Sequence, residues 1–158
     1  RDSSTSRGLG DVYKRQIEKA AGLSLVDVLK CFGEEEYRAG EKRVMKRLLQ
    51  GAPCVLASGG GSFVAEQTRE LAKIHAITVW LKADVDVLYN RTAGRKHRPF
   101  LEGDDSHLKN KLEKYISEEY PYYSEADIVV ETREEQVDNT VLRVIDAIDN
   151  FLSSKKTA

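Results

Sequence analysis

The sequence is poor in the features that define several classes of protein. Its two cysteines, Cys31 and Cys54, lie far apart and lack metal-site spacing, so we expect core residues in a reducing compartment. No apolar run approaches the length of a membrane-spanning helix. The net charge of −1 offers nothing suited to a polyanion. We therefore expect a soluble, cytoplasmic, single-domain protein that binds neither nucleic acid nor membrane.

The first sixteen residues, 1–16, lack any structural period. Residues 11–16 resemble the translation of a transposon-end sequencing adaptor, and residues 1–3 resemble the tail of the same adaptor. We interpret this segment as a non-native leader, with an ordinary disordered leader as the alternative. The expected organisation is this leader, one truncated domain over residues 17–152 and a frayed tail over 153–158.

The rest of the chain alternates between strand and helix patterns. Apolar and β-branched runs predict buried strands over residues 54–57, 77–81 and 127–131. Apolar residues at helical spacing predict helices on either side of a break at Gly33, and then over residues 64–74, 84–91, 106–120 and 137–152. Pro121 is expected to end the helix over residues 106–120. The alternation predicts an α/β fold with a parallel sheet covered by helices on both faces.

Three consecutive glycines, Gly59, Gly60 and Gly61, follow the first predicted strand. Glycine allows the backbone to approach another group closely. Because α/β sheets bind ligands at the carboxyl ends of their strands, the triplet is a candidate ligand-binding loop. An ordinary tight turn explains the triplet equally well when it is considered alone.

Two arginines are further candidates for binding. Arg38 lies in an acidic stretch, where it forms either a surface ion pair or a planar fork that grips a carboxylate. The basic segment 91–99 lacks apolar periodicity and is expected to be a mobile loop or lid. Within it, Arg98 directly precedes a proline and suits a phosphate clamp, although charge runs are usually solvated.

Taken in order, these motifs resemble the shikimate kinase family. The resemblance covers almost everything after Gln16, and the ordered series carries it more than any single motif. The residues concerned are Ile17-Glu18, Gly22, Gly33-Glu34, Tyr37-Arg38, Glu41, Gly59-Gly60-Gly61, Trp80-Leu81, Arg91, Arg98-Pro99-Phe100-Leu101, Pro121, Tyr123 and Ala126-Asp127.

This resemblance implies a P-loop, nucleoside-monophosphate-kinase-like three-layer fold with a parallel sheet. It also implies transfer of the γ-phosphate of ATP to the 3-hydroxyl of shikimate, with Mg²⁺, in aromatic amino-acid biosynthesis through chorismate. Shikimate and ATP are then the expected partners of a monomeric enzyme.

The resemblance also implies roles for individual residues on the acceptor side. Arg38 falls where the family grips the shikimate carboxylate, and Glu41 falls where a carboxylate supports that arginine. Gly60, flanked by Gly59 and Gly61, falls where backbone approaches shikimate.

On the nucleotide side, the resemblance implies a catalytic role for Arg98, which falls on the lid arginine that reaches the ATP phosphates and the transferring group. Arg91 falls where an arginine packs against adenine. No residue is assigned as a metal ligand, because the histidines are scattered without ligand spacing.

Three departures from the family pattern stand out. No stretch matches the phosphate-cradling pattern GxxxxGK[ST]. Val12 and Lys14 stand where the family has two aspartates, the second of which would orient the attacking hydroxyl. We therefore expect the N-terminal strand, the phosphate loop and most of the ATP and Mg²⁺ sites to be missing, and the chain as written to be inactive.

The third departure is Glu119, which stands where the family has a second substrate arginine. A carboxylate there should repel the substrate carboxylate. A sequencing error, compensation by another basic residue and an altered substrate are the three explanations. Another small-molecule kinase of the same fold, such as a gluconate-kinase-like enzyme, and a non-catalytic relative are therefore the alternative functions.

Overall fold

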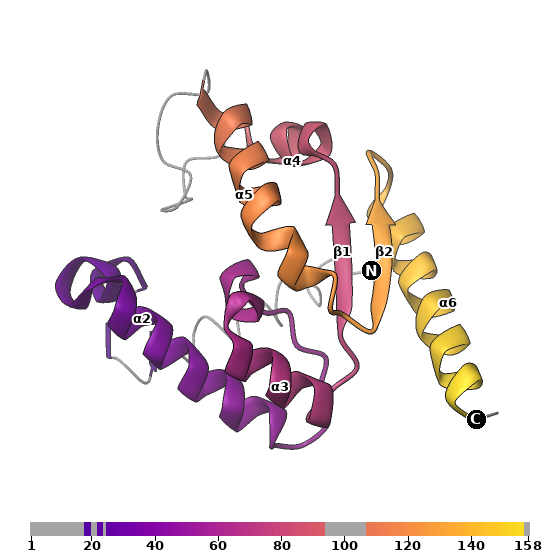
Figure 1. Cartoon of the computed structure of the whole chain (residues 1–158), viewed down its shortest axis with the longest axis horizontal. Helices are drawn as coiled ribbons and strands as arrows, with labels where there is room; N and C mark the ends of the chain where they lie inside the picture. The colour runs from indigo at the N-terminus through magenta and orange to yellow at the C-terminus, as the bar shows by residue number, and fades with distance from the viewer. Residues whose placement is uncertain (1–17, 20–21, 24, 94–106, 157–158) are drawn as a thin grey trace, which may run out of the picture. The chain divides into compact units, whose positions relative to one another are not determined.

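The computed structural model describes residues 18–19, 22–23, 25–93 and 107–156 (Figure 1). The chain divides into two compact units, residues 1–76 and 77–158. The expected leader and most of the expected lid, including Arg98, lie outside the described residues.

The first unit is built on the long helix α2 (Leu25–Leu49), which breaks at Gly33. Gly33 has φ 81° and ψ 175°, a backbone conformation that is essentially restricted to glycine. The break predicted at this residue is therefore confirmed. After the break, Tyr37 and Val44 are buried on one face, as their helical spacing predicts.

Val44 and Met45 form the buried core of this unit, and Leu48, Leu49 and Leu56 pack against them. The strand predicted over 54–57 is wrong, because these residues form no strand in the structure. A strand exists only where its backbone groups pair with a neighbour, and no described strand pairs with this segment. Leu56 is held by its packing against α2, whereas the side chain of Val55 is 77% exposed.

Both cysteines are free and exposed, so the expectation that they belong to the core is wrong. Cys54 lies in the segment with which no described strand pairs. Cys31 lies on α2 before the break, in a stretch of exposed residues from 30 to 36. Phe32 and Val55, the apolar residues directly after each cysteine, are 58% and 77% exposed.

The glycine triplet leads into a short 3₁₀ helix, η1 (Gly60–Val64), and then into α3 (Glu66–His75). The turn is closed by the backbone N–H of Ser62, which donates to the carbonyl of Gly59 at 3.1 Å. The buried guanidinium of Arg69 donates to the carbonyls of Phe63 and Val64 at 3.1 and 2.6 Å. These bonds satisfy the end of η1 and fix the loop against α3.

The second unit contains the parallel pair of strands β1 (Val79–Ala83) and β2 (Ile128–Thr132) (Figure 1). These confirm two of the predicted strands and their parallel pairing. The carboxylate of Asp127 accepts hydrogen bonds from the backbone N–H and the hydroxyl of Thr78 at 2.9 and 2.7 Å, just before the strands begin. Partial burial opposes the charge on Asp127, but these bonds outweigh it and lower the pKa of the carboxyl.

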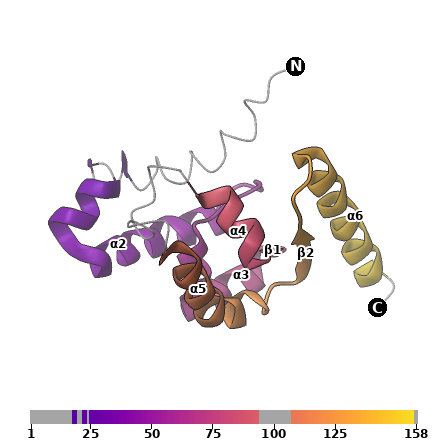
Figure 2. The same cartoon turned by 90° about the horizontal axis from the view of Figure 1, so that it is seen from above.

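Three helices complete this unit: α4 (Val85–Thr92), α5 (Leu108–Tyr123) and α6 (Val137–Lys156). α6 runs beside β2 in both views (Figures 1 and 2). α5 lies against α4, where Lys109 pairs with Asp86 at 2.8 Å.

Pro121 lies inside α5, so the prediction that it ends the helix is wrong by a few residues. A proline removes only one backbone hydrogen bond, and near the end of a helix that loss is small. The N–H of Ser124 still donates to the carbonyl of Tyr120 at 2.9 Å, which closes the last turn beyond the proline.

The break at Gly33 generates a prediction about stability. Gly33→Ala should lower the free energy of unfolding by about 1–3 kcal/mol, because alanine is strained at this φ and ψ. A Cβ there meets no atom within 4 Å, so the cost is one of backbone conformation alone. Chemical denaturation monitored by circular dichroism measures it.

Gly40→Ala is the matched control in the same helix. Its added Cβ makes only an ordinary contact, 3.8 Å from Nη2 of Arg43. It should raise stability by about 0.5–1 kcal/mol, because alanine favours helix interiors over glycine. Equal effects of the two substitutions would contradict the assigned strain at Gly33.

Candidate functional site

Arg38 and Glu41 form an ion pair on the inner face of α2. Nη1 of Arg38 donates to Oε2 of Glu41 at 3.1 Å. The Glu41 side chain is only 3% exposed, while that of Arg38 is 28% exposed. A carboxylate buried to this degree requires a cation or several hydrogen bonds to remain charged. The guanidinium therefore neutralises Glu41 and still reaches the surface.

The other terminal nitrogen of Arg38 points to a second carboxylate. Nη2 donates to Oε1 of Glu34 at 3.2 Å, and the Glu34 side chain is 64% exposed. Partial burial opposes the charge on Arg38, but the hydrogen bonds and charges of Glu41 and Glu34 outweigh it and raise the pKa of Arg38. Arg38 thus remains a cation between a buried and an exposed carboxylate.

Tyr37 provides further support for Glu41. Its hydroxyl donates to Oε1 of Glu41 at 3.4 Å, so the two carboxylate oxygens have different donors. Burial, followed by the negative charge of Glu41, raises the pKa of Tyr37 to about 12. The phenol is therefore protonated and able to donate at every physiological pH.

The glycine triplet closely approaches this ion pair. A Cβ added at Gly61 would lie 2.4 Å from Nη1 of Arg38, and one at Gly59 would lie 3.1 Å from Oε1 of Glu41. Gly60 lies between them as the first residue of η1. Any side chain at Gly61 would overlap the guanidinium, so the glycine is required by the arginine that it covers.

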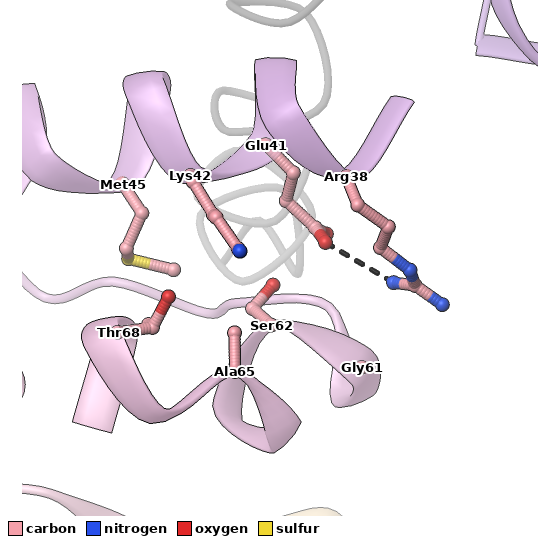
Figure 3. A pocket seen from close by; sticks show the side chains of 8 residues that line it. All are labelled: Arg38, Glu41, Lys42, Met45, Gly61, Ser62, Ala65 and Thr68. Atoms are coloured by element: carbon pink, nitrogen blue, oxygen red, sulfur yellow. Dashed lines mark hydrogen bonds and ion pairs between the residues drawn. The ribbon is translucent and has the colours of Figure 1, made fainter. Parts of the chain in front are cut away.

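A small pocket opens between α2 and the turn that follows the triplet (Figure 3). Figure 3 shows the inner nitrogen of Arg38 directed to Glu41 and the outer nitrogen directed away from it. The residues that line the pocket are Arg38, Glu41, Lys42, Met45, Gly61, Ser62, Ala65 and Thr68.

Three polar members of this pocket, Lys42, Ser62 and Thr68, were not predicted from the sequence. Lys42 follows Arg38 by four residues on the same helix, a spacing that places both on one side. Ser62 directly follows the triplet and is buried, as is Thr68 at the start of α3. The spacing from Arg38 and the position after the glycines were the signals that could have identified Lys42 and Ser62.

Arg91 belongs to the second unit, at the end of α4. Its Nη2 donates to the carbonyl of Arg133 at 2.7 Å, and its Nη1 reaches the hydroxyl of Thr132 at 3.5 Å. The guanidinium is thereby held beside the end of β2. Arg98 lies outside the described residues, so Arg38, Glu41 and the triplet are the predicted site residues that the structure brings together.

Glu119 is engaged within its own helix. Its carboxylate accepts a hydrogen bond from the hydroxyl of Tyr123, one turn further along α5. Burial, followed by this contact with Glu119, raises the pKa of Tyr123. The rings of Tyr120 and Tyr123 lie 4.8 and 6.0 Å from that of Trp80, so the glutamate borders an aromatic cluster.

Two absences apply to the part of the chain that the structure describes. Among the described residues, no group of three or more histidine, cysteine, aspartate or glutamate side chains is arranged to hold a metal ion. No helix in that same part combines the length and apolar character that a membrane crossing requires.

Comparison with known proteins gives consistent matches. The family model described as shikimate kinase matches residues 9–149. The shikimate kinase of Paramagnetospirillum magneticum is 43% identical over 143 residues, which are 90% of this chain and 72% of the relative. The shikimate kinase of Ruegeria pomeroyi is 42% identical over 134 residues, which are 84% of this chain and 68% of the relative.

Among solved structures, the shikimate kinase of Acinetobacter baumannii in complex with shikimate matches with a TM-score of 0.80 at 27% identity. The match covers 90% of this chain and 78% of that chain. The predicted fold class, a P-loop kinase fold of the nucleoside-monophosphate-kinase type, is confirmed by this likeness.

The contact between the triplet and Arg38 generates a second prediction. Gly61→Ala should displace the guanidinium, because the added methyl would lie 2.4 Å from Nη1 and 2.8 Å from Cζ. Weakening the bond to the buried Glu41 should lower the free energy of unfolding by about 1–3 kcal/mol. Urea denaturation measures this loss.

A double-mutant cycle with Arg38→Ala identifies the cause. Once the guanidinium is absent, the methyl at position 61 has room, so Gly61→Ala should cost much less in that background. An equal cost in both backgrounds would show that the glycine is required for another reason.

Tyr37 generates a third prediction. Because its pKa in the folded protein is raised from 10.0 to about 12, the unfolded chain loses the proton first as the pH rises. The stability that Tyr37 contributes should be complete below about pH 10, its unfolded value, and lost between there and pH 12. Tyr37→Phe should remove this loss.

Ultraviolet absorbance of tyrosinate, compared between the wild-type protein and Tyr37→Phe, reports the titration directly. Glu41→Gln should lower the pKa of Tyr37, since the negative charge of Glu41 helps to raise it. A Tyr37 transition near pH 10 in the folded wild-type protein would contradict the assigned burial and contact.

Proposed function

The chain belongs to the shikimate kinase family, and we propose on that premise that it binds shikimate and that its activity is ATP-dependent phosphorylation of the 3-hydroxyl. The observation that carries the proposal is the Arg38–Glu41 pair beneath the glycine loop. It offers a partly exposed guanidinium of fixed orientation at the edge of a pocket, which suits a small carboxylic acid.

In this proposal, Arg38 binds the substrate carboxylate through charge-assisted hydrogen bonds. Glu41 and Tyr37 are positioning residues, because they hold the arginine without needing to touch the substrate. The backbone of Gly59–Gly61 supplies the wall that the ring of the substrate meets, since no side chain stands between.

The nucleotide side of the proposal rests on fewer residues. ATP would supply the phosphoryl group, Arg98 would bind its phosphates, and Arg91 would pack against adenine. The anchoring of Arg91 by the carbonyl of Arg133 supports a flat, fixed guanidinium there. Phosphoryl transfer depends mainly on positioning and on neutralising charge, which are functions that arginines provide.

Mg²⁺ is the metal that the family implies, but the described residues form no cluster of ligands that fits it. The sequence also lacks the GxxxxGK[ST] pattern of a phosphate-cradling loop. We therefore assign no catalytic step to Mg²⁺ or to a phosphate-cradling loop. That this chain does not turn over substrate stays a prediction.

Glu119 favours a second candidate, a kinase of the same fold that acts on a different small molecule. A carboxylate at the position of a substrate arginine would repel an acidic substrate. Its hydrogen bond from Tyr123 argues for a structural role within α5 instead, which leaves the carboxylate-binding proposal for Arg38 intact.

Binding of shikimate to the full 158-residue chain tests the proposal by isothermal titration calorimetry. Arg38→Met should weaken binding by a factor of roughly 10–100, since a hydrogen-bonded ionic contact contributes about 1.5–3 kcal/mol. Arg43→Met is the matched control, because Arg43 lies on the same helix and pairs with the exposed Glu36. It should leave the affinity unchanged.

Equal losses in both variants, or none in Arg38→Met, would contradict the role of Arg38. Failure of the folded wild-type chain to bind shikimate would contradict the proposed substrate. ATP-dependent turnover by the chain would support the function but disprove the expected inactivity.

A further inference from the structure

We propose that Glu34 is an internal competitor for the substrate: its carboxylate occupies the outer side of Arg38 in the ligand-free protein and is replaced there by the carboxylate of the ligand. This inference rests on the proposed function and refines it, because it names a residue that sets the affinity of the same site without contacting the substrate.

The two carboxylates on Arg38 are held very differently. Glu41 is buried and receives donors from both Arg38 and Tyr37. Glu34 is 64% exposed and lies on the first helical turn after the break at Gly33. Removing Glu41 from Arg38 would leave a buried charge unpaired, whereas Glu34 can rotate into water without such a penalty.

The contacts around Arg38 favour the outer side of the guanidinium for an incoming carboxylate. Gly61 covers the guanidinium so closely that its Cβ would overlap Nη1, Cζ and Nη2. Nη1 is already committed to Glu41, and Figure 3 shows the other terminal nitrogen directed away from that residue. A ligand carboxylate that approaches from the outer side therefore meets Nη2, where Glu34 now accepts a hydrogen bond.

The exchange is balanced in charge. One carboxylate leaves Nη2 and another takes its place, so Arg38 keeps two negative partners before and after binding. Exposed ion pairs of adjacent helical turns are weak and are screened by salt, so Glu34 yields readily to a ligand held by additional contacts. The ligand binds only those molecules in which Glu34 has left Nη2. The apparent affinity for the ligand is therefore lower than the affinity of a site without Glu34.

Glu34→Gln in the full chain is the direct test, with Glu35→Gln as the matched control. Both substitutions remove one exposed negative charge from neighbouring positions of α2, but the ion pair with Arg38 belongs to Glu34. The probes are shikimate, methyl shikimate, which lacks the negative charge, and cyclohex-1-enecarboxylate, which lacks the hydroxyls. Calorimetry at low salt measures each dissociation constant.

We expect Glu34→Gln to tighten the binding of both carboxylates by about two- to fivefold, as removal of a weak ion-pair competitor implies. Methyl shikimate should show no gain, and Glu35→Gln should gain much less with either carboxylate. Unchanged or weaker binding of the carboxylates by Glu34→Gln would overturn the inference, and weaker binding would mean that Glu34 stays to support Arg38.

The outcomes separate this inference from the proposed function. If the wild-type chain binds shikimate and Glu34→Gln binds it no more tightly, the function stands and the competition is disproved. If only cyclohex-1-enecarboxylate binds and Glu34→Gln tightens it, the competition stands and the proposed substrate is wrong. If no variant binds either carboxylate although circular dichroism shows all to be folded, both are disproved.

Discussion

The ion pair between Arg38 and Glu41 is the interaction on which the site depends. A carboxylate as deeply buried as Glu41 needs a cation or several hydrogen bonds beside it, and Arg38 supplies a cation at 3.1 Å. The guanidinium in turn occupies the space that a side chain at Gly61 would need. The burial of Glu41 on α2 thus requires Arg38 beside it. The position of Arg38 in turn requires glycine at residue 61 of the loop.

The constraint extends outward from that contact. The turn after the triplet is closed through Gly59 and Ser62, and its last carbonyls are bound by the buried Arg69 of α3. The loop is therefore fixed both by the ion pair beneath it and by the helix that follows it. Such support on two sides restricts the conformations of the loop and of Arg38, and a group held in this way would lose little entropy on binding a ligand.

Sequence reasoning predicted what depends on local patterns. The break at Gly33, the buried face containing Tyr37 and Val44, and the parallel strands β1 and β2 all follow from residue type and spacing. The run over 54–57 has the composition of a strand, but a strand also needs a partner, which composition does not reveal. Lys42 was missed because the sequence does not show which face of α2 meets the glycine loop, whereas an ion pair of Arg38 with a nearby acidic residue was one of its two expected roles.

For Arg38, the sequence left open whether the residue forms an ion pair or grips a ligand. The geometry makes these two possibilities compatible, since the arginine needs Glu41 to hold it and still keeps an outer nitrogen that reaches the surface. Arg38, its two carboxylate partners and the glycine triplet lie between Glu34 and Gly61, within one unit of the chain. The proposed binding of a carboxylate therefore rests on geometry within this unit, and a binding measurement can test it without any phosphate transfer.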